Sequence, residues 1–179
     1  CRPWRENEVR SALEKAAGEL RGKLRTGGCP AVRLTLERDG HAVYEISPPR
    51  PPWRKDGVLL KLSRERVDSN NPFLYHKTTF RELFDREYRQ AVREGFDEVI
   101  FCNEKGFLTE GAISSLFIRK EGQWLTPRLA NGLLPGIWRQ VQQTHLAPIE
   151  YQVRPRLPLP VERLDSTLDI EPPALIKGY

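Results

Sequence analysis

The sequence has little cysteine and no long apolar run. Its 179 residues include three cysteines, Cys1, Cys29 and Cys102, whose spacing fits neither a disulfide framework nor a metal site. An odd number of cysteines without a pattern is typical of a reducing compartment, so we expect a cytoplasmic protein. No apolar run approaches the roughly 20 residues that cross a bilayer. No apolar stretch follows residues 1–5 either, so we expect neither a membrane span nor a signal peptide.

Other functional signatures are missing as well. The three histidines, His41, His76 and His145, have no metal-ligand spacing, and no glycine-rich nucleotide loop or Ser/His/Asp constellation stands out. The net charge of +5 is modest, and the arginines are scattered rather than gathered in a basic stripe with stacking aromatics. We therefore expect no nucleic-acid partner. A weaker interpretation of the charge is an attraction for anionic small molecules.

The first part of the chain predicts an incomplete domain. Asn7 is placed to cap a helix that runs to about Arg21, and residues 31–36 and 41–46 alternate as two strands around a tight turn at Asp39 and Gly40. One helix and one hairpin are too few for a stable domain, so residues 1–47 are interpreted as a partial N-terminal α+β domain. Residues 48–56 are rich in proline, which lacks the N–H that a sheet interior needs, and predict an interdomain linker.

Residues 57–179 predict a second α+β domain. A helix is expected to begin near Thr79 and to end at Gly95, because apolar residues recur there at helical spacing and glycine is a common C-terminal cap. A second helix is expected from about Gly136 to Thr144. Strands are expected at residues 58–62, 99–101, 107–109, 114–118, 123–125 and 150–153. The remaining residues, 155–179, carry many prolines and show no clear period.

Three blocks of this second part carry a resemblance. They are Leu-Tyr-His-Lys-Thr-Thr-Phe-Arg at residues 74–81, Leu-Thr-Glu-Gly-Ala-Ile-Ser-Ser-Leu-Phe at 108–117, and Asn-Gly-Leu-Leu-Pro-Gly-Ile-Trp-Arg at 131–139, which Thr-Pro precedes at 126–127. In this order they resemble the class IV aminotransferases, the pyridoxal 5'-phosphate enzymes of fold type IV. Within that family they look most like 4-amino-4-deoxychorismate lyases, especially those fused behind an aminodeoxychorismate synthase. The resemblance implies a two-domain, D-amino-acid-aminotransferase-like α+β fold with an incomplete first domain.

Lys77 is the candidate catalytic residue. Most lysines are solvated surface charges, with an unperturbed pKa of about 10.4. Covalent bonding to the cofactor needs a neutral amine, so burial or a nearby cation must lower that pKa. Lys77 lies among Leu74, Tyr75 and Phe80, with Arg81 four residues on and a predicted helix start close behind. In the family, the matching lysine binds pyridoxal phosphate covalently and then moves protons.

Glu110 is the candidate partner of the cofactor ring. Its simpler interpretation is a turn carboxylate on a solvated hairpin. The resemblance instead implies that Glu110 keeps the pyridine nitrogen protonated, which makes the ring an electron sink. Gly111 beside it would allow a close backbone approach. Ser115 is the matching position for a further cofactor contact, although the family often has asparagine there.

The block at residues 131–139 predicts a phosphate site. A turn that opens a helix presents free amides to an anion, although an ordinary loop-to-helix junction has the same form. The resemblance implies that Leu134 packs on the cofactor ring and that the amides of Gly136 and Ile137 bind its phosphate. Branched-chain aminotransferases have threonine where Trp138 stands and a cofactor-facing tyrosine where Glu82 stands. Both departures weaken the aminotransferase interpretation.

Three residues are candidates for substrate contact: His76, Arg81 and Arg33. His76 belongs to the lyase-like His-Lys-Thr sequence, and its alternative is a pocket or core position without a base role. Arg33 on the predicted hairpin could meet a substrate carboxylate, and its alternative is a solvated surface arginine. Arg81 is the cation that follows Lys77.

The sequence thus predicts a lyase that converts 4-amino-4-deoxychorismate to 4-aminobenzoate and pyruvate. The alternatives are a branched-chain or D-amino-acid aminotransferase and a non-catalytic fold type IV fragment with a structural or interaction role. The resemblance further implies a homodimer, a possible fusion to or action with aminodeoxychorismate synthase, and additional cofactor ligands before Cys1 and in a late loop that residues 168–179 do not show. We therefore expect this chain to bind the cofactor weakly or not at all.

Overall fold

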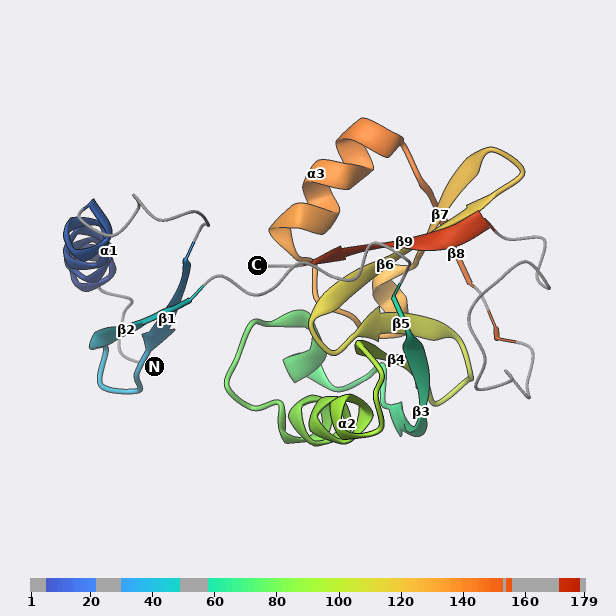
Figure 1. Ribbon diagram of the computed structural model, residues 1–179, viewed down its shortest axis with the longest axis horizontal. Coiled ribbons are helices and arrows are strands. Elements are labelled where there is room, and N and C mark those ends of the chain that lie inside the picture. Colours follow the sequence, from blue (N-terminus) through green and yellow to red (C-terminus); the bar gives the residue numbers. More distant parts are fainter. Residues whose placement is uncertain (1–5, 22–29, 49–57, 153, 156–170, 178–179) are drawn as a thin grey trace. The chain divides into compact units, whose positions relative to one another are not determined.

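The computed structural model describes residues 6–21, 30–48, 58–152, 154–155 and 171–177 (Figure 1). Contacts within the chain group it into two compact units, residues 1–52 and 53–179, which are described separately. Apart from the exposed Pro48, the predicted linker lies outside the described residues, so the division at residues 48–56 stays a prediction. No helix in the described ranges is long and apolar enough to cross a membrane.

The described part of the first unit, residues 6–21 and 30–48, forms one helix and one hairpin. Helix α1 (Glu6–Arg21) buries Ala12 and Ala16 and contacts strands β1 (Ala31–Leu36) and β2 (Ala42–Ser47), which pair antiparallel. Gly40 supplies the left-handed turn conformation at φ 91°, as the Asp-Gly pair predicted. Asn7 is not the helix cap that the sequence predicted, because α1 already begins at Glu6 and Asn7 lies in its first turn.

In its described residues, the second unit contains two sheets and two α-helices. One sheet has the order β3-β4-β5, with β3 (Leu60–Val67) parallel to β4 (Glu98–Asn103) and β5 (Leu108–Gly111) antiparallel to it. The other has the order β8-β7-β6-β9, and its strands are β6 (Ser114–Lys120), β7 (Gln123–Pro127), β8 (Ile149–Tyr151) and β9 (Glu171–Lys177). The helices are α2 (Glu82–Arg93) and α3 (Ile137–Leu146), with short 3-10 turns η1 (Pro72–Tyr75) and η2 (Leu129–Asn131).

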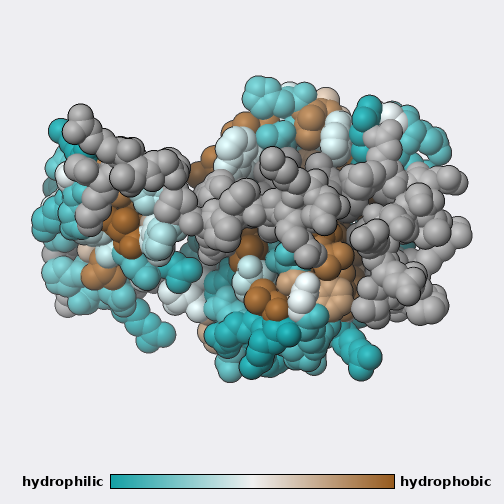
Figure 2. All heavy atoms as spheres, viewed as in Figure 1, coloured by the Kyte–Doolittle hydropathy of each residue, from teal (hydrophilic) through white to brown (hydrophobic). Residues whose placement is uncertain are grey.

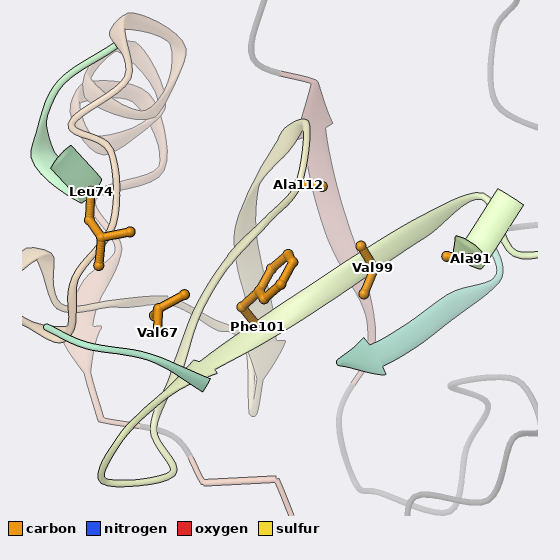
Figure 3. Close-up of a cluster of buried hydrophobic side chains, with 6 residues drawn as sticks. All are labelled: Val67, Leu74, Ala91, Val99, Phe101 and Ala112. Atoms are coloured by element: carbon orange, nitrogen blue, oxygen red, sulfur yellow. The ribbon is translucent and has the colours of Figure 1, made fainter. Parts of the chain in front are cut away.

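The core lies on both faces of β4, whose six residues are all buried. Val99 and Phe101 join one cluster with Val67, Leu74, Ala91 and Ala112, which Figure 3 shows spread along the strand from η1 to α2. Ile100 and Cys102 alternate to the opposite face and pack with Leu108, Leu116 and Ile118. The period of two along a doubly buried strand explains why the sequence shows a continuous apolar run here. Figure 2 shows hydrophilic residues over much of the visible described surface, with small hydrophobic patches between them.

Several element boundaries differ from the sequence prediction. Helix α2 begins at Glu82 rather than near Thr79, and β3 runs on to Val67 through a polar stretch that the apolar pattern missed. Gly95 ends α2 in a left-handed conformation, at φ 89°, as predicted. Strand β9 was not predicted at all, because Pro172 and Pro173 argue against a strand. Its observed pairing with β6 places it at the end of the strand order, where proline is tolerated.

Candidate active site

A cavity of about 630 Å³ opens in the second unit. Its lining comes from the segment before α2, the start of α2, the β5–β6 connection and the start of α3, so all three sequence blocks meet there. Five cationic residues and three carboxylates line it: Arg66, Lys77, Arg81, Arg86, Arg139, Asp68, Glu82 and Glu110. This excess of positive charge favours an anionic occupant.

The chain ahead of Lys77 is held by local hydrogen bonds. Asn71 caps η1 by accepting from the Phe73 amide at 3.0 Å, and the Tyr75 hydroxyl donates to the Ser69 carbonyl at 2.8 Å. Lys77 then reaches the cavity wall. Its residue is exposed, so the burial that the sequence predicted around it is not present in this structure. Because α2 starts at Glu82, the helix end also lies further along the chain than the sequence predicted.

Arg81 is fixed between α2 and the β5–β6 connection. Its Nη2 donates to the Ala112 carbonyl at 2.5 Å, and its Nε donates to Oδ1 of Asp85 at 3.1 Å. The guanidinium also lies over the Phe84 ring, 5.6 Å from the centroid. These contacts hold a half-buried cation at the cavity wall, where it acts on Glu110.

Glu110 lies in β5 and lines the cavity rather than a solvated turn. Desolvation by burial raises the pKa of its carboxyl from 4.5 to about 8. The Leu134 amide, which donates to Oε1 at 3.0 Å, and the charges of Arg81, Lys77 and Arg139 oppose that rise. Glu110 therefore carries a proton at neutral pH in the cofactor-free chain. A protonated pyridine nitrogen placed beside it would stabilise its ionised form.

The turn before α3 brings three predicted residues together. Leu134 and Gly136 are half-buried and Ile137 is exposed, and all three line the cavity. The sequence predicted free amides at both Gly136 and Ile137, but the Gly136 amide donates to the Leu134 carbonyl at 2.8 Å. The amide of Ile137, the first residue of α3, has no carbonyl partner within the helix. A side chain added at Gly136 would meet nothing within 4 Å, so there is open space beside the helix start.

Arg139 is a site residue that the sequence blocks contained but did not assign. It is 3% exposed, and its Nη2 donates to the Pro127 carbonyl at 2.8 Å and to Oε1 of Glu150 at 3.0 Å. Among the described residues its Nε has no hydrogen-bond partner. Its position in the first turn of α3, after the Pro-Gly pair, was the signal that could have identified it. Arg139 ties the start of α3 to the end of β7.

The other predicted residues lie in less central places. Ser115 is buried in β6 and lines the cavity. His76 also lines it, but its residue is exposed. Arg33 is an exposed residue of β1 and belongs to the first unit.

The residues present fit a phosphate-bearing pyridine cofactor. Half-buried Glu110 supplies a carboxyl of raised pKa for a ring nitrogen, and the space beside Gly136 and the Ile137 amide suits a phosphate group. Lys77 lines the same cavity and provides the amine. The groups that such a cofactor needs therefore line one cavity, although they come from separate parts of the chain.

Comparison with known proteins relates this chain to one family and to relatives with two different named activities. The family profile described as amino-transferase class IV matches residues 2–166. A Schizosaccharomyces pombe protein named "Putative aminodeoxychorismate lyase" is 27% identical over 129 residues, which are 68% of this chain and 54% of that protein. A Thermotoga maritima protein named "Probable branched-chain-amino-acid aminotransferase" is 29% identical over 137 residues, 75% of this chain and 47% of that protein. The chain thus spans about half the length of these curated relatives.

Among solved structures, one from Mesorhizobium loti, titled as a "Putative amino-acid aminotransferase", superposes with a TM-score of 0.73 at 32% identity. The match covers 85% of this chain and 71% of that one. The mixed α+β architecture predicted from the sequence is confirmed by this similarity, and the partial coverage of the solved chains is consistent with the predicted incomplete first domain.

Proposed function

Because this chain belongs to the class IV aminotransferases, whose members use pyridoxal phosphate, we propose that it is a lyase acting on 4-amino-4-deoxychorismate, with 4-aminobenzoate and pyruvate as products. The observation that carries the proposal is the meeting of Lys77, Glu110 and the α3 start around one cation-rich cavity. The named lyase relative supports the reaction assigned here.

Four residues would hold the cofactor. Lys77 would bind it covalently, Glu110 would hold a proton at the ring nitrogen, Leu134 would pack against the ring, and the Ile137 amide with the space at Gly136 would take the phosphate. When bound, the cofactor supplies an electron-withdrawing ring next to the carbon that carries the substrate amine. Ser115 is proposed as a further contact because it is buried at the same wall.

In the proposed reaction Lys77 acts as the base. With the substrate amine held at the cofactor, the Nζ of Lys77 would take the proton from the ring carbon that bears that amine. The carbon–oxygen bond to the enolpyruvyl group then breaks, the ring becomes aromatic, and the enolpyruvate takes up a proton to become pyruvate. Glu110 keeps its charge near the ring nitrogen through this step, because the Leu134 amide continues to hold its Oε1.

The cationic lining supports a substrate with two carboxylates. Arg66 and Arg81 line the cavity in addition to the residues assigned to the cofactor, and 4-amino-4-deoxychorismate carries one carboxylate on its ring and one on its enolpyruvyl group. Arg81 is rigidly held and forms the better anchor, since a fixed guanidinium binds a carboxylate with less loss of freedom. His76 is proposed as a second contact at the rim. Arg33 stays a prediction for a substrate contact.

A second candidate is an aminotransferase acting on branched-chain or D-amino acids. The Thermotoga maritima relative favours it, with an identity close to that of the lyase-named relative. Trp138 stands at the cavity where the sequence comparison expected threonine for that activity, and this supports the lyase. A homodimer, a fusion to aminodeoxychorismate synthase and a cytoplasmic location are kept as further proposals for the whole protein.

The discriminating experiment supplies the purified chain and pyridoxal phosphate with each substrate in turn. With 4-amino-4-deoxychorismate we expect 4-aminobenzoate, followed by its fluorescence, and an equal amount of pyruvate, followed with lactate dehydrogenase. With a branched-chain or D-amino acid and 2-oxoglutarate we expect no glutamate. Glutamate formation without 4-aminobenzoate would replace the lyase by the aminotransferase. Cofactor that never binds would support the non-catalytic fragment.

A further inference from the structure

Glu98 is a fully buried carboxylate outside the cavity. It is the first residue of β4, it is 0% exposed, and it is not among the cavity-lining residues. Desolvation by burial raises the pKa of its carboxyl, and the hydrogen bonds to it oppose that rise. A buried carboxylate is costly unless its oxygens have donors, so the identity of those donors shows what the residue holds in place.

All but one of the hydrogen bonds to this carboxylate come from the segment that follows Glu110. Oε1 accepts from the Ala112 amide at 3.1 Å and from its own neighbour Val99 at 2.9 Å. Oε2 accepts from the Ile113 amide at 3.2 Å and from the Ser114 hydroxyl at 2.7 Å. The carboxylate therefore gathers three consecutive residues of the β5–β6 connection.

Gly111 is shaped to admit this carboxylate. A Cβ at Gly111 would lie 2.8 Å from Oε2 and 2.9 Å from Cδ of Glu98, and it would also collide with the Ser114 hydroxyl. Any larger residue beside Glu110 would push the carboxylate away. The glycine that follows Glu110 is thus explained by Glu98 behind it, and the sequence offered only a general reason for a close approach.

The same segment is bound from its other side by Arg81. The Ala112 amide donates to Oε1 of Glu98 at 3.1 Å and to the Val99 carbonyl at 3.0 Å, while the Ala112 carbonyl accepts from Nη2 of Arg81. Arg81 in turn is the largest cationic influence on Glu110, ahead of Lys77 and Arg139. Hydrogen bonds therefore lead from Glu98 through Ala112 to Arg81, and the charge of Arg81 acts through space on Glu110.

We propose that Glu98 is a positioning residue of this active site, which holds residues 111–114 so that Arg81 stays within electrostatic reach of Glu110. The inference rests on the role proposed above for Glu110. If Glu98 served stability alone, its substitution would lower the free energy of unfolding. The pKa of Glu110 would then stay unchanged in any variant that still folds.

The test shortens the side chain and keeps its charge. Glu98→Asp cannot reach both the Ala112 and Ile113 amides, so residues 111–114 loosen and the Arg81 contact weakens. Glu110 is followed in the cofactor-free chain by carbon-13 NMR of labelled glutamate carboxyls and assigned by the signal missing from Glu110→Gln. We expect Glu98→Asp to raise the pKa of Glu110 by roughly half a unit or more, because the opposing cation has moved.

The matched control is Glu87→Asp. Glu87 accepts from the Ser63 hydroxyl at 2.8 Å in the same unit, pairs with Arg86 at 3.5 Å and does not line the cavity. Glu87→Asp shortens a glutamate side chain in the same way and should leave the pKa of Glu110 unchanged. An unshifted Glu110 in folded Glu98→Asp, or an equal shift in the control, would overturn the proposal.

A double variant tests the route through Arg81. Arg81→Gln alone should raise the pKa of Glu110, and adding Glu98→Asp should then raise it no further. Additive shifts would contradict the route. If Glu98→Asp does not fold, amide hydrogen exchange in the unaltered chain decides, because the acceptor of the Ile113 amide is Oε2 of Glu98. This amide should be protected as strongly as those of β4, and fast exchange would overturn the proposal. Because these measurements need no cofactor, their failure is distinct from failure of the proposed reaction.

Discussion

The amide of Leu134 donates a 3.0 Å hydrogen bond to Oε1 of Glu110, and this bond joins two parts of the site that the sequence keeps 24 residues apart. Leu134 belongs to the turn before α3, where the phosphate is proposed to bind, and Glu110 is the proposed partner of the cofactor ring. The proposed ring partner and the proposed phosphate site are therefore joined before any cofactor arrives. This preorganisation is what a site that binds both ends of one molecule requires.

The raised pKa of Glu110 predicts that the cofactor-free chain loses stability as the pH rises. Folding raises the pKa of the Glu110 carboxyl from 4.5 to about 8. Between these pH values the folded chain keeps a proton that the unfolded chain has released, so the free energy of unfolding falls as the pH rises. Glu110→Gln should flatten this decline. Urea unfolding at pH 5, 6, 7 and 8 measures it, and parallel curves for both proteins would contradict the pKa assigned to Glu110.

Cofactor affinity should depend on the same carboxyl. Below about pH 8 Glu110 brings its own proton to the ring nitrogen, whereas above that pH the complex must take one up from solution. The dissociation constant should therefore rise about tenfold per pH unit above the break. The measurement uses Lys77→Ala, so that covalent bonding adds no pH dependence of its own. Adding Glu110→Gln to Lys77→Ala should weaken cofactor binding and remove the break in the pH dependence of the dissociation constant. A break that persists in the double variant would belong to the titration of another group.

Turnover should depend strongly on Glu110. A neutral amide cannot hold the ring nitrogen protonated, so Glu110→Gln should slow the lyase by on the order of 10²-fold or more while the cofactor still attaches to Lys77. The measurement is 4-aminobenzoate formation at saturating cofactor. Near-normal turnover in the folded, cofactor-loaded variant would contradict the role proposed for Glu110.

Substitution of Gly132 is expected to disturb both the segment that leads to Lys77 and the turn before α3. Gly132 ends η2 at φ 90°, and a Cβ there would lie 2.9 Å from both Cα of Ser69 and Cδ1 of Leu74. Gly132→Ala should cost about 2 kcal/mol or more in the free energy of unfolding, from backbone strain and from the collision. It should also weaken cofactor binding, because the Lys77 segment and the phosphate turn are pressed together there.

The control for this substitution is Gly122→Ala. Gly122 has a similar φ of 78° but nothing lies within 4 Å of its Cβ position. It should show the strain alone, about 1 kcal/mol, with cofactor affinity unchanged. Equal effects of the two substitutions would mean that the contact with Ser69 and Leu74 contributes nothing.

The sequence predicted the main parts of this site because each depends on a short local pattern. Lys77, Glu110 and the start of α3 lie in contiguous blocks, and the structure brings them to one cavity. Contacts between distant segments could not be predicted in this way. Glu98 reads as one more charged residue until residues 112–114 are seen to surround it. Strand β9 was missed for the same reason, since only its pairing with β6 explains its prolines.

The exposure of Lys77 shows where a local sequence pattern gave a wrong prediction. Its apolar neighbours in the sequence predicted a buried amine, but Phe80 is 69% exposed and Phe73 is 50% exposed, and their rings pack on each other 5.0 Å apart. Apolar neighbours along the chain bury a lysine only if the fold turns them toward it. Here the aromatic pair lines the cavity and does not enclose Lys77.

The central claim is that Lys77 carries the cofactor, and covalent labelling tests it most directly. The chain is incubated with pyridoxal phosphate at a concentration that saturates even a weak site, reduced with borohydride, digested and mapped by mass spectrometry, with Lys61 and Lys105 as internal controls outside the cavity lining. We predict a label on Lys77 that approaches one per chain, little label on the controls, and none at this position in Lys77→Ala. A label on another lysine while Lys77 stays unmodified would contradict the account.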